Sequence, residues 1–294
     1  MAMLNKKIDF LLFVSVVMAN PNGDPLNGNR PRFDYNNYGE MTAECVKRKI
    51  RNRMQDMGKE IFVQSNERCV DGCKSLSERY ENYFKSIKMS KTKSNQDERA
   101  KFTCEKWIDV RSFGQVFAFS GGKKSKENEG DNVSIGVRGP VSIHQAVSVD
   151  PIEVCSYQIT KSVNGSDKDD KKGSDTMGMK HMVKFGLYEI KGSINVQLAE
   201  KTGFTAEDAD VIKECLRTLF ENDASSARPD GSMEVVKLYW WEHNSKTGQY
   251  SSAKVHRSVK AVLKDGIVTP SSVNDYDFVI NQLDGLVPDI IDGY

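Results

Sequence analysis

A cluster of cations follows Thr42 in the segment T-A-E-C-V-K-R-K-I-R-N-R. Lys47, Arg48 and Arg51 lie in it, after a loop rich in proline, glycine and asparagine. Lysine and arginine side chains pair with phosphate oxygens, and backbone N–H groups at the start of a helix bind the same oxygens. A solvated basic helix face is the commoner interpretation of such a cluster. A long irregular loop in front of it favours a functional role, here phosphate binding.

The residues offer little catalytic chemistry. Asp24 and Asp34, in the loop before Thr42, are the only carboxylates that we consider for catalysis, and capping of turns is their ordinary role. The four histidines are scattered, and His144 fits a ligand-facing and a plain surface position equally well. Nucleophile elbow, Walker, H-E-x-x-H and G-x-G-x-x-G motifs are absent from the sequence. We therefore expect no catalytic group, metal or cofactor.

Composition bounds the class of protein. The 294 residues hold 42 Lys and Arg against 41 Asp and Glu, a net charge of +1. A nucleic-acid binder often has a clear basic excess, so this balance argues mildly against that function without excluding a local basic groove. The six cysteines form no regular framework, and thiols are favoured over a zinc site at Cys69 and Cys73. With no apolar run that could span a bilayer and no secretory cleavage site, we expect a cytoplasmic protein.

The elements that must position the cations are predicted from apolar spacing. Residues 8–18 are apolar on both faces, which is typical of a strand in the middle of a sheet. Thr42 is a good N-cap for the helix that follows, and Gly58 can end it. The buried stripe of this helix is expected at Ala43, Val46, Ile50, Met54 and Met57.

Further strands and helices follow along the chain. Strands are expected at 60–64, 133–149 with a break at Gly139-Pro140, 155–163, 185–198, 233–241 and 255–263, and helices at 76–89, 97–113 and after the Thr205–Asp208 capping signature. Residues 121–132 are expected to form a charged linker, residues 164–175 a solvated loop, and the chain ends in an acidic stretch without a clear pattern.

The order strand, helix, strands, helix, strand predicts an α+β fold with a ferredoxin-like, RNA-recognition-type core. The core would consist of residues 1–64, 133–150 and 185–263. Three additions follow from the remaining residues: a helical insertion at 65–132, a long β-hairpin at 150–184 and a C-terminal tail at 264–294.

Several motifs resemble the backbone subunit of type I CRISPR surveillance complexes. They are N-P-N-G-D-P from Asn20, the T-x-x-x-V-K-R-K-I-R helix from Thr42, D-V-R-S-F-G-Q-V-F from Asp109, V-R-G-P-V-S-I-H-Q-A-V-S-V-D-P-I from Val137 and M-G-M-K-H-M-V-K-F-G-L-Y from Met177. The chain is identified as a member of the repeat-associated (RAMP) superfamily and resembles its type I-C backbone protein. The resemblance spans roughly residues 8–243.

This resemblance implies a fold and a function. The core would be the palm, the insertion the fingers and the hairpin the thumb. The protein would be a non-catalytic subunit of a type I-C Cascade complex that polymerises along a CRISPR RNA and presents it to target DNA in antiviral defence. Its implied partners are CRISPR RNA, target DNA through guide pairing, further copies of itself in a helical filament, other Cascade subunits and, through the complex, a nuclease-helicase. No membrane partner is expected.

RNA contacts are expected from cations on phosphates and from apolar or aromatic wedges against bases. Tyr157, Ile159 and Met182 belong to the hairpin that would supply the wedges, and a satellite packing cluster is the alternative for its methionines. The predicted RNA-binding residues are Asn20, Asn22, Arg30, Arg32, Thr42, Lys47, Arg48, Arg51, Arg111, Arg138, His144, Tyr157, Met177, Met179 and His181.

Two other functions stay open at this point. One is a metal-dependent endoribonuclease using Asp24 or Asp34, because relatives in type III complexes cut RNA with a loop aspartate. The other is a free-standing RNA-binding protein of the RNA-recognition type.

Overall fold

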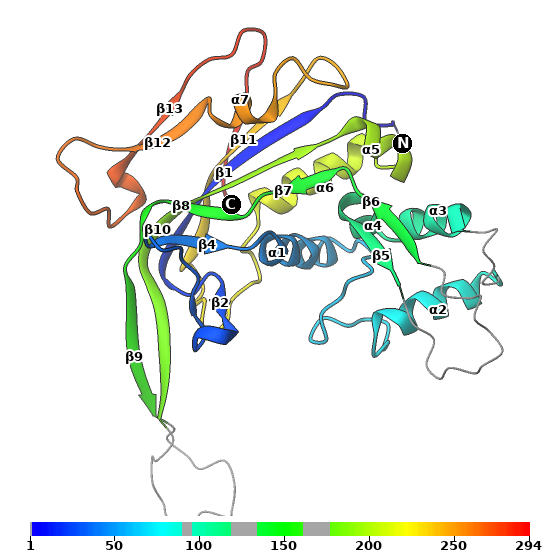
Figure 1. The fold of residues 1–294 in the computed structure, drawn as a ribbon, viewed down its shortest axis with the longest axis horizontal. Coiled ribbons are helices and arrows are strands. Elements are labelled where there is room, and N and C mark those ends of the chain that lie inside the picture. The colour runs from blue at the N-terminus through cyan, green and yellow to red at the C-terminus, as the bar shows by residue number, and fades with distance from the viewer. Residues whose placement is uncertain (1, 90–95, 119–133, 161–176) are drawn as a thin grey trace, which may run out of the picture.

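The computed structural model describes residues 2–89, 96–118, 134–160 and 177–294 (Figure 1). The predicted linker at 121–132 and the predicted loop at 164–175 lie outside these residues. Among the described helices, none combines the length and the apolar composition needed to cross a membrane.

β1 (Ile8–Ala19) is the central strand of a large antiparallel sheet. β10 (Met177–Ile194) pairs with one edge of β1 and β11 (Met233–Glu242) with the other. Every β1 residue from Ile8 to Val16 is buried, as its apolar faces predict. The sheet order is β14-β11-β1-β10-β8-β4, with β7 and β9 also paired to β10. The further strands are β4 (Tyr38–Met41), β7 (Val141–Ile143), β8 (Ala146–Pro151), β9 (Val154–Thr160) and β14 (Asp289–Asp292).

Helices cover one face of this sheet. α1 (Ala43–Asp56), α5 (Val196–Thr202) and α6 (Ala206–Arg217) pack against the even-numbered side chains of β1 from Phe10 to Val16. The chain order β1, α1, β8, β10, α6, β11 and the sheet order β11-β1-β10-β8 are those of a ferredoxin-like domain. The predicted α+β class is therefore confirmed.

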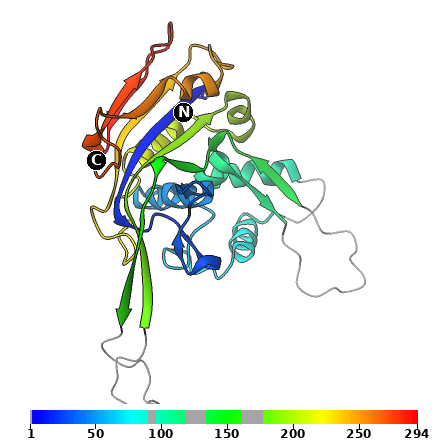
Figure 2. The same ribbon diagram turned by 60° about the vertical axis from the view of Figure 1, so that its left-hand side comes forward.

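The C-terminal segment covers the opposite face. α7 (Ser252–His256) and the paired strands β12 (Val259–Leu263) and β13 (Tyr276–Ile280) lie over it, as Figure 2 shows. Leu11 and Phe13 of β1 are buried in this second core, and the Phe13 ring centroid lies 4.9 Å from that of Phe278. The palm sheet is thus closed on both faces around β1. The 264–294 tail, where we expect no pattern, supplies β13 and the edge strand β14.

The helical insertion has a core of its own. It contains α2 (Leu76–Ser86), α3 (Gln96–Lys106), α4 (Ile108–Phe113) and the paired strands β5 (Gly114–Phe117) and β6 (Ile135–Arg138). Aromatic side chains dominate this core, and Trp107 occupies the N-cap of α4, which interrupts the helix predicted at 97–113. The buried aromatic residues are Phe62, Tyr80, Phe84, Trp107 and Phe117.

A long hairpin extends from the palm. β9 pairs with the first part of β10, from Thr160 opposite Met177 to Val154 opposite Val183. β1 ends where Ala19 pairs with Val183, so the hairpin continues beyond its neighbour in the sheet. Figures 1 and 2 show it as a separate arm, on the side of α1 opposite the insertion.

Some local predictions are wrong because side chains cap backbone groups. Residues 60–64 form no strand, since the N–H groups of Phe62 and Val63 donate to the buried carboxylate of Asp109 at 2.7 and 3.1 Å. The strand predicted at 185–198 ends at Ile194. Asn195 then caps α5 by accepting a hydrogen bond from the N–H of Leu198 at 2.8 Å.

Two other boundaries shift where the chain bends. A second break, at His144-Gln145, separates β7 from β8 and reverses the alternation, so that Ser148 is buried and Val147 is exposed. The strand predicted at 255–263 begins only at Val259, because α7 precedes it.

Candidate nucleic-acid interface

Polar side chains fold the loop between β1 and α1. Asn22 Oδ1 accepts a hydrogen bond from the Thr42 N–H at 2.9 Å, and Thr42 Oγ1 caps α1 by accepting one from the Cys45 N–H at 3.2 Å. Asn20 is buried and donates to the Asn29 carbonyl at 2.7 Å. Asn20 Oδ1 is a buried acceptor without a partner in the described residues.

The two loop aspartates hold turns. Asp24 Oδ1 accepts a hydrogen bond from the backbone N–H two positions later at 3.2 Å and lies 3.4 Å from Arg32 Nη2. Asp34 Oδ1 accepts from the N–H groups two and four positions later at 2.8 and 2.9 Å. Both therefore fill the ordinary Asx-turn role.

Besides Arg32, two of the predicted cations are engaged in ion pairs within the protein. Arg51 Nε donates to Asp109 Oδ2 at 2.9 Å, and Asp109 is fully buried. Arg111 donates to both carboxylate oxygens of Asp208 at 2.8 and 2.7 Å. These ion pairs join α1 to α4 and α4 to α6, so both arginines have a structural role whether or not they touch RNA.

Lys47 and Arg48 differ from these paired cations. Neither lies within ion-pair distance of a carboxylate of the described residues. The Lys47 ammonium lies 5.9 Å from the Phe113 ring centroid. Arg48 is half-buried and donates to the Val63 carbonyl. Burial and, next, the nearby Arg51 charge lower the pKa of Arg48 to about 10. The charge of Asp109 opposes this shift only in part. A partly desolvated guanidinium without a direct ion pair favours an anionic ligand such as phosphate.

A polar chain crosses from the loop to the base of the hairpin. Arg30, on β3 (Arg30–Pro31), donates to Ser156 Oγ at 3.4 Å, and Ser156 Oγ lies 2.8 Å from Nδ1 of His181. Burial and then the charge of Arg30 lower the pKa of His181. The structure thus brings Arg30 and His181, which are far apart in sequence, into one cluster.

The hairpin exposes apolar side chains on both of its faces. Tyr157 and Ile159 alternate along β9 and are 45% and 51% exposed, while Met177 and Met179 of β10 are 68% and 55% exposed. Met179 pairs with Gln158, so the methionines point to the face opposite Tyr157. Met182, in contrast, is buried. Exposed apolar groups on so narrow an arm indicate a surface that another molecule covers.

Comparison with known proteins decides the family. The family model described as CRISPR-associated protein Cas7 matches residues 6–281, from just before β1 to just after β13. The chain belongs to the CRISPR-associated protein Cas7 family. It is also 24% identical, over 273 residues, to a CRISPR-associated protein Cas7 of Haloferax volcanii, covering 87% of this chain and 79% of that protein.

Two solved structures match at lower similarity. A chain described as a CRISPR RNA-guided surveillance complex, pre-nicking, matches with a TM-score of 0.45 and 13% identity over 80% of this chain and 78% of that chain. A second, a CRISPR RNA-guided surveillance complex, matches with a TM-score of 0.43 and 16% identity over 80% of this chain and 68% of that chain.

Two predicted contacts of this Cas7-family chain lie apart from the others. His144 is exposed, and its ring centroid lies 5.7 Å from that of His256 on α7, the helix on the face of the sheet opposite α1. Arg138 is exposed on β6 of the insertion, opposite Gly114. The structure therefore does not bring these two residues to α1 or to the hairpin, and their RNA contacts stay predictions.

The Cas7-family fold presents further groups beside the predicted ones that were not predicted from the sequence. Leu26 and Tyr35 stand fully exposed on the loop before α1, at 98% and 106%. Lys180 pairs across the hairpin with Tyr157 and has no carboxylate partner in the described residues. Three aromatic residues in the polar loop segment F-D-Y-N-N-Y are the signal that could have pointed to Tyr35.

Proposed function

We propose that this Cas7-family protein is a non-catalytic subunit that binds CRISPR RNA and forms the backbone of a type I-C Cascade complex. Copies would polymerise along the guide in a helical filament and present it for pairing with target DNA in antiviral defence. Sequence specificity would then belong to base pairing rather than to side chains. The complex would act in the cytoplasm, with other Cascade subunits and a separate nuclease-helicase.

The uncompensated pair Lys47 and Arg48 carries this proposal. Most neighbouring cations are neutralised within the protein, as Lys49 is by Asp223, Arg51 by Asp109 and Arg53 by Asp56. Lys47 and Arg48 thus stand out as charges that a phosphate backbone would complete. Phosphate contacts of this kind bind any sequence, which is what a guide-independent backbone subunit requires.

The closed sheet argues against a free-standing RNA-recognition module. Such modules stack bases on aromatic side chains of an open sheet face. Here Phe13 and Tyr239, aromatic residues on the sheet face opposite the helices, are buried beneath β12 and β13. RNA would instead follow α1, the loop before it and the hairpin.

The loop aspartates argue against the endoribonuclease alternative. Asp24 and Asp34 both accept backbone hydrogen bonds, and Asp24 also pairs with Arg32. A turn-holding role accounts for both carboxylates without a reaction.

One purification tests the proposal. The full chain is expressed with its CRISPR array, purified, and the bound RNA is sequenced. We expect guide-derived RNA covered at a regular spacing by copies of the protein, and the RNA should stay intact with Mg²⁺ or Mn²⁺. Bound RNA without CRISPR repeats would contradict the backbone role, and metal-dependent cutting lost in Asp24→Asn or Asp34→Asn would establish the nuclease.

A further inference from the structure

We propose that a pocket between α1 and the helical insertion receives a nucleobase of a single-stranded nucleic acid. The inference rests on the nucleic-acid binding proposed above and adds a base-contacting site to the phosphate-contacting helix. The pocket, called here the insertion pocket, has a volume of about 540 Å³ and is lined among others by Gln55, Lys59, Ile61, Val70, Tyr83 and Trp107. Small-molecule sites commonly enclose roughly 300–1,000 Å³, so a nucleotide fits.

Apolar side chains form the walls of the insertion pocket. The ring centroids of Tyr83 and Trp107 lie 5.0 Å apart with an interplanar angle of 62°. Ile61 is buried beside them, and Val70 is 81% exposed. Aromatic and aliphatic walls of this kind suit a flat, apolar-faced ligand such as a base.

A buried acceptor in the pocket lining, Gln55 Oε1, calls for a ligand with a hydrogen-bond donor at its edge. Gln55 Nε2 donates to the Arg68 carbonyl at 3.0 Å, whereas Gln55 Oε1 is buried without a partner in the described residues. A buried acceptor without a hydrogen bond is unfavourable. A ligand with N–H groups at the edge of a flat ring would complete it, and nucleobases have such edges.

A cation at the same pocket suits a phosphate. Lys59 is exposed and lies within ion-pair distance of no carboxylate in the described chain. Lys106, which also lines the pocket, is instead paired with Glu60. A base inside the pocket and a phosphate at Lys59 would together make up a nucleotide.

The position of the pocket connects it to the proposed RNA path. Arg48, Asn52 and Gln55 follow one another on one face of α1, and Arg48 Nη1 lies 3.5 Å from Asn52 Oδ1. Gln55 lies seven residues after Arg48, which corresponds to about 10 Å along the helix. Arg48 also donates to the carbonyl of Val63, next to Gln64 in the pocket lining. A strand held at Arg48 therefore reaches the insertion pocket along α1.

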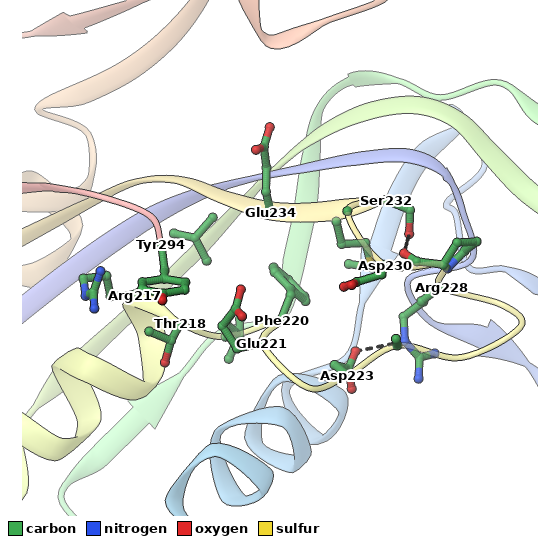
Figure 3. A pocket seen from close by; sticks show the side chains of 16 residues that line it. Arg217, Thr218, Phe220, Glu221, Asp223, Arg228, Asp230, Ser232, Glu234 and Tyr294 are labelled. Carbon is green, nitrogen blue, oxygen red and sulfur yellow. Dashed lines mark hydrogen bonds and ion pairs between the residues drawn. The ribbon is translucent and has the colours of Figure 1, made fainter. Parts of the chain in front are cut away.

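Another hollow lacks these properties. It measures about 530 Å³ and lies between the end of α6, the segment 218–232 and Tyr294 (Figure 3). Its arginines are engaged: Arg228 pairs with Asp223 at 3.0 Å and the Arg217 guanidinium lies 5.3 Å from the Tyr294 ring centroid. Its exposed acidic side chains would repel phosphate, and they are Glu221, Asp230 and Glu234.

A titration with mononucleotides tests the pocket independently of guide binding. The full chain is titrated with AMP and with adenosine by ligand-observed NMR. We expect AMP to bind more tightly than adenosine, and Lys59→Ala to remove that difference. Gln55→Leu should weaken AMP about fivefold, the loss of one hydrogen bond. Val70→Trp should abolish binding by filling the pocket, whereas the matched change Val268→Trp, at a residue that is 89% exposed elsewhere, should not. AMP binding that is absent, or unchanged in Val70→Trp, would overturn the inference.

Crosslinking identifies the strand that uses the pocket. Complexes are assembled with 4-thiouridine in the CRISPR RNA or with 4-thiothymidine in the paired DNA, irradiated, and analysed by mass spectrometry. A crosslink to a peptide with Tyr83 or Trp107 in one arm, lost in Val70→Trp, assigns the base to that strand; crosslinks elsewhere in both arms would overturn the inference. Lys47→Ala should weaken RNA binding but leave the AMP titration unchanged, so failure of the pocket and failure of the proposed function give different results.

Discussion

Arg111 of α4 donates two parallel hydrogen bonds to the carboxylate of Asp208, at the start of α6. Asp208 also accepts the Thr205 N–H at 3.0 Å and closes the capping box of α6. One carboxylate thus starts a helix of the palm and attaches the insertion to it.

Arg111→Ala should lower the free energy of unfolding by about 2–3 kcal/mol, because it strands a buried carboxylate. Arg111→Lys should recover little of this stability, since lysine cannot donate two parallel hydrogen bonds to one carboxylate. Urea denaturation checks both, with the exposed Arg138→Ala as a control within about 0.5 kcal/mol of the parent protein. An Arg111→Lys variant of parental stability whose RNA affinity depends less on salt would instead make Arg111 a phosphate contact.

Lys47→Ala and Arg48→Ala should weaken RNA of any sequence about equally. Each should reduce the slope of log affinity against log salt by about 0.7, the single-strand value for one phosphate contact. Fluorescence anisotropy over a salt series measures this, with the exposed Lys260→Ala of β12 as the matched control. A changed guide preference with an unaltered slope would refute the phosphate role.

Asp34→Ala should cost about 1 kcal/mol of stability, because two backbone N–H groups lose their acceptor. RNA incubated with Mg²⁺ should stay intact with the parent protein and with Asp24→Asn alike. Denaturing gels of the bound RNA provide the measurement, and cutting by the parent alone would contradict the binding-only function.

Met179→Asp should block assembly on RNA while leaving the chain folded, because Met179 is 55% exposed on the hairpin. Deletion of residues 161–177 should do the same. Circular dichroism checks folding and electron microscopy with RNA scores assembly. Met57→Leu, at a partly buried residue that packs against the core, is the control and should cost less than about 1.5 kcal/mol. Normal assembly by the folded deletion variant would show that the hairpin is no intersubunit thumb.

Acidification should destabilise the protein through His256. This residue is buried, donates a hydrogen bond from Nε2 to the Gly192 carbonyl oxygen at 3.0 Å, and faces His144, Asp9 and Lys191. Burial lowers its pKa below the ordinary 6.5. The unfolded chain therefore binds more protons near that pH, and stability that is present above it is lost as the pH falls. Denaturation at pH 7 and pH 5 measures the loss, which His256→Gln should reduce.

Short-range patterns predicted several elements of the main sheet. β1 is apolar on both faces, Thr42 and Thr205 are strong helix caps, and the strand predicted at 233–241 is β11. The alternation at 185–198 showed only part of β10, which begins eight residues earlier, at Met177, and ends at Ile194. The insertion was harder to predict, since Asp109 captures the N–H groups of Phe62 and Val63 from a distance of more than 40 residues in sequence. No local pattern reveals such an acceptor.

For the candidate site, too, local features could be predicted from the sequence and long-range contacts could not. The sequence shows that Lys47, Arg48 and Arg51 are close together, but only the fold shows that Arg51 pairs with a carboxylate and that, among the residues the structure describes, the other two have no such partner. The contact between Arg30 and the Ser156–His181 pair joins residues over 120 positions apart. Helical spacing and charge predict neither which cations are paired with carboxylates nor which distant residues contact Arg30.

Because β1 is the central strand, it is synthesised well before the strands that pair with it. β1 is made first, yet its partners β10 and β11 begin only at Met177 and Met233. At about 5–20 residues per second, a ribosome needs on the order of ten seconds to reach them. Throughout that interval the most apolar strand of the chain has unpaired edges and two uncovered faces, and such non-local pairing folds slowly. We expect the nascent chain to depend on a chaperone that shields residues 8–19 until the sheet can close.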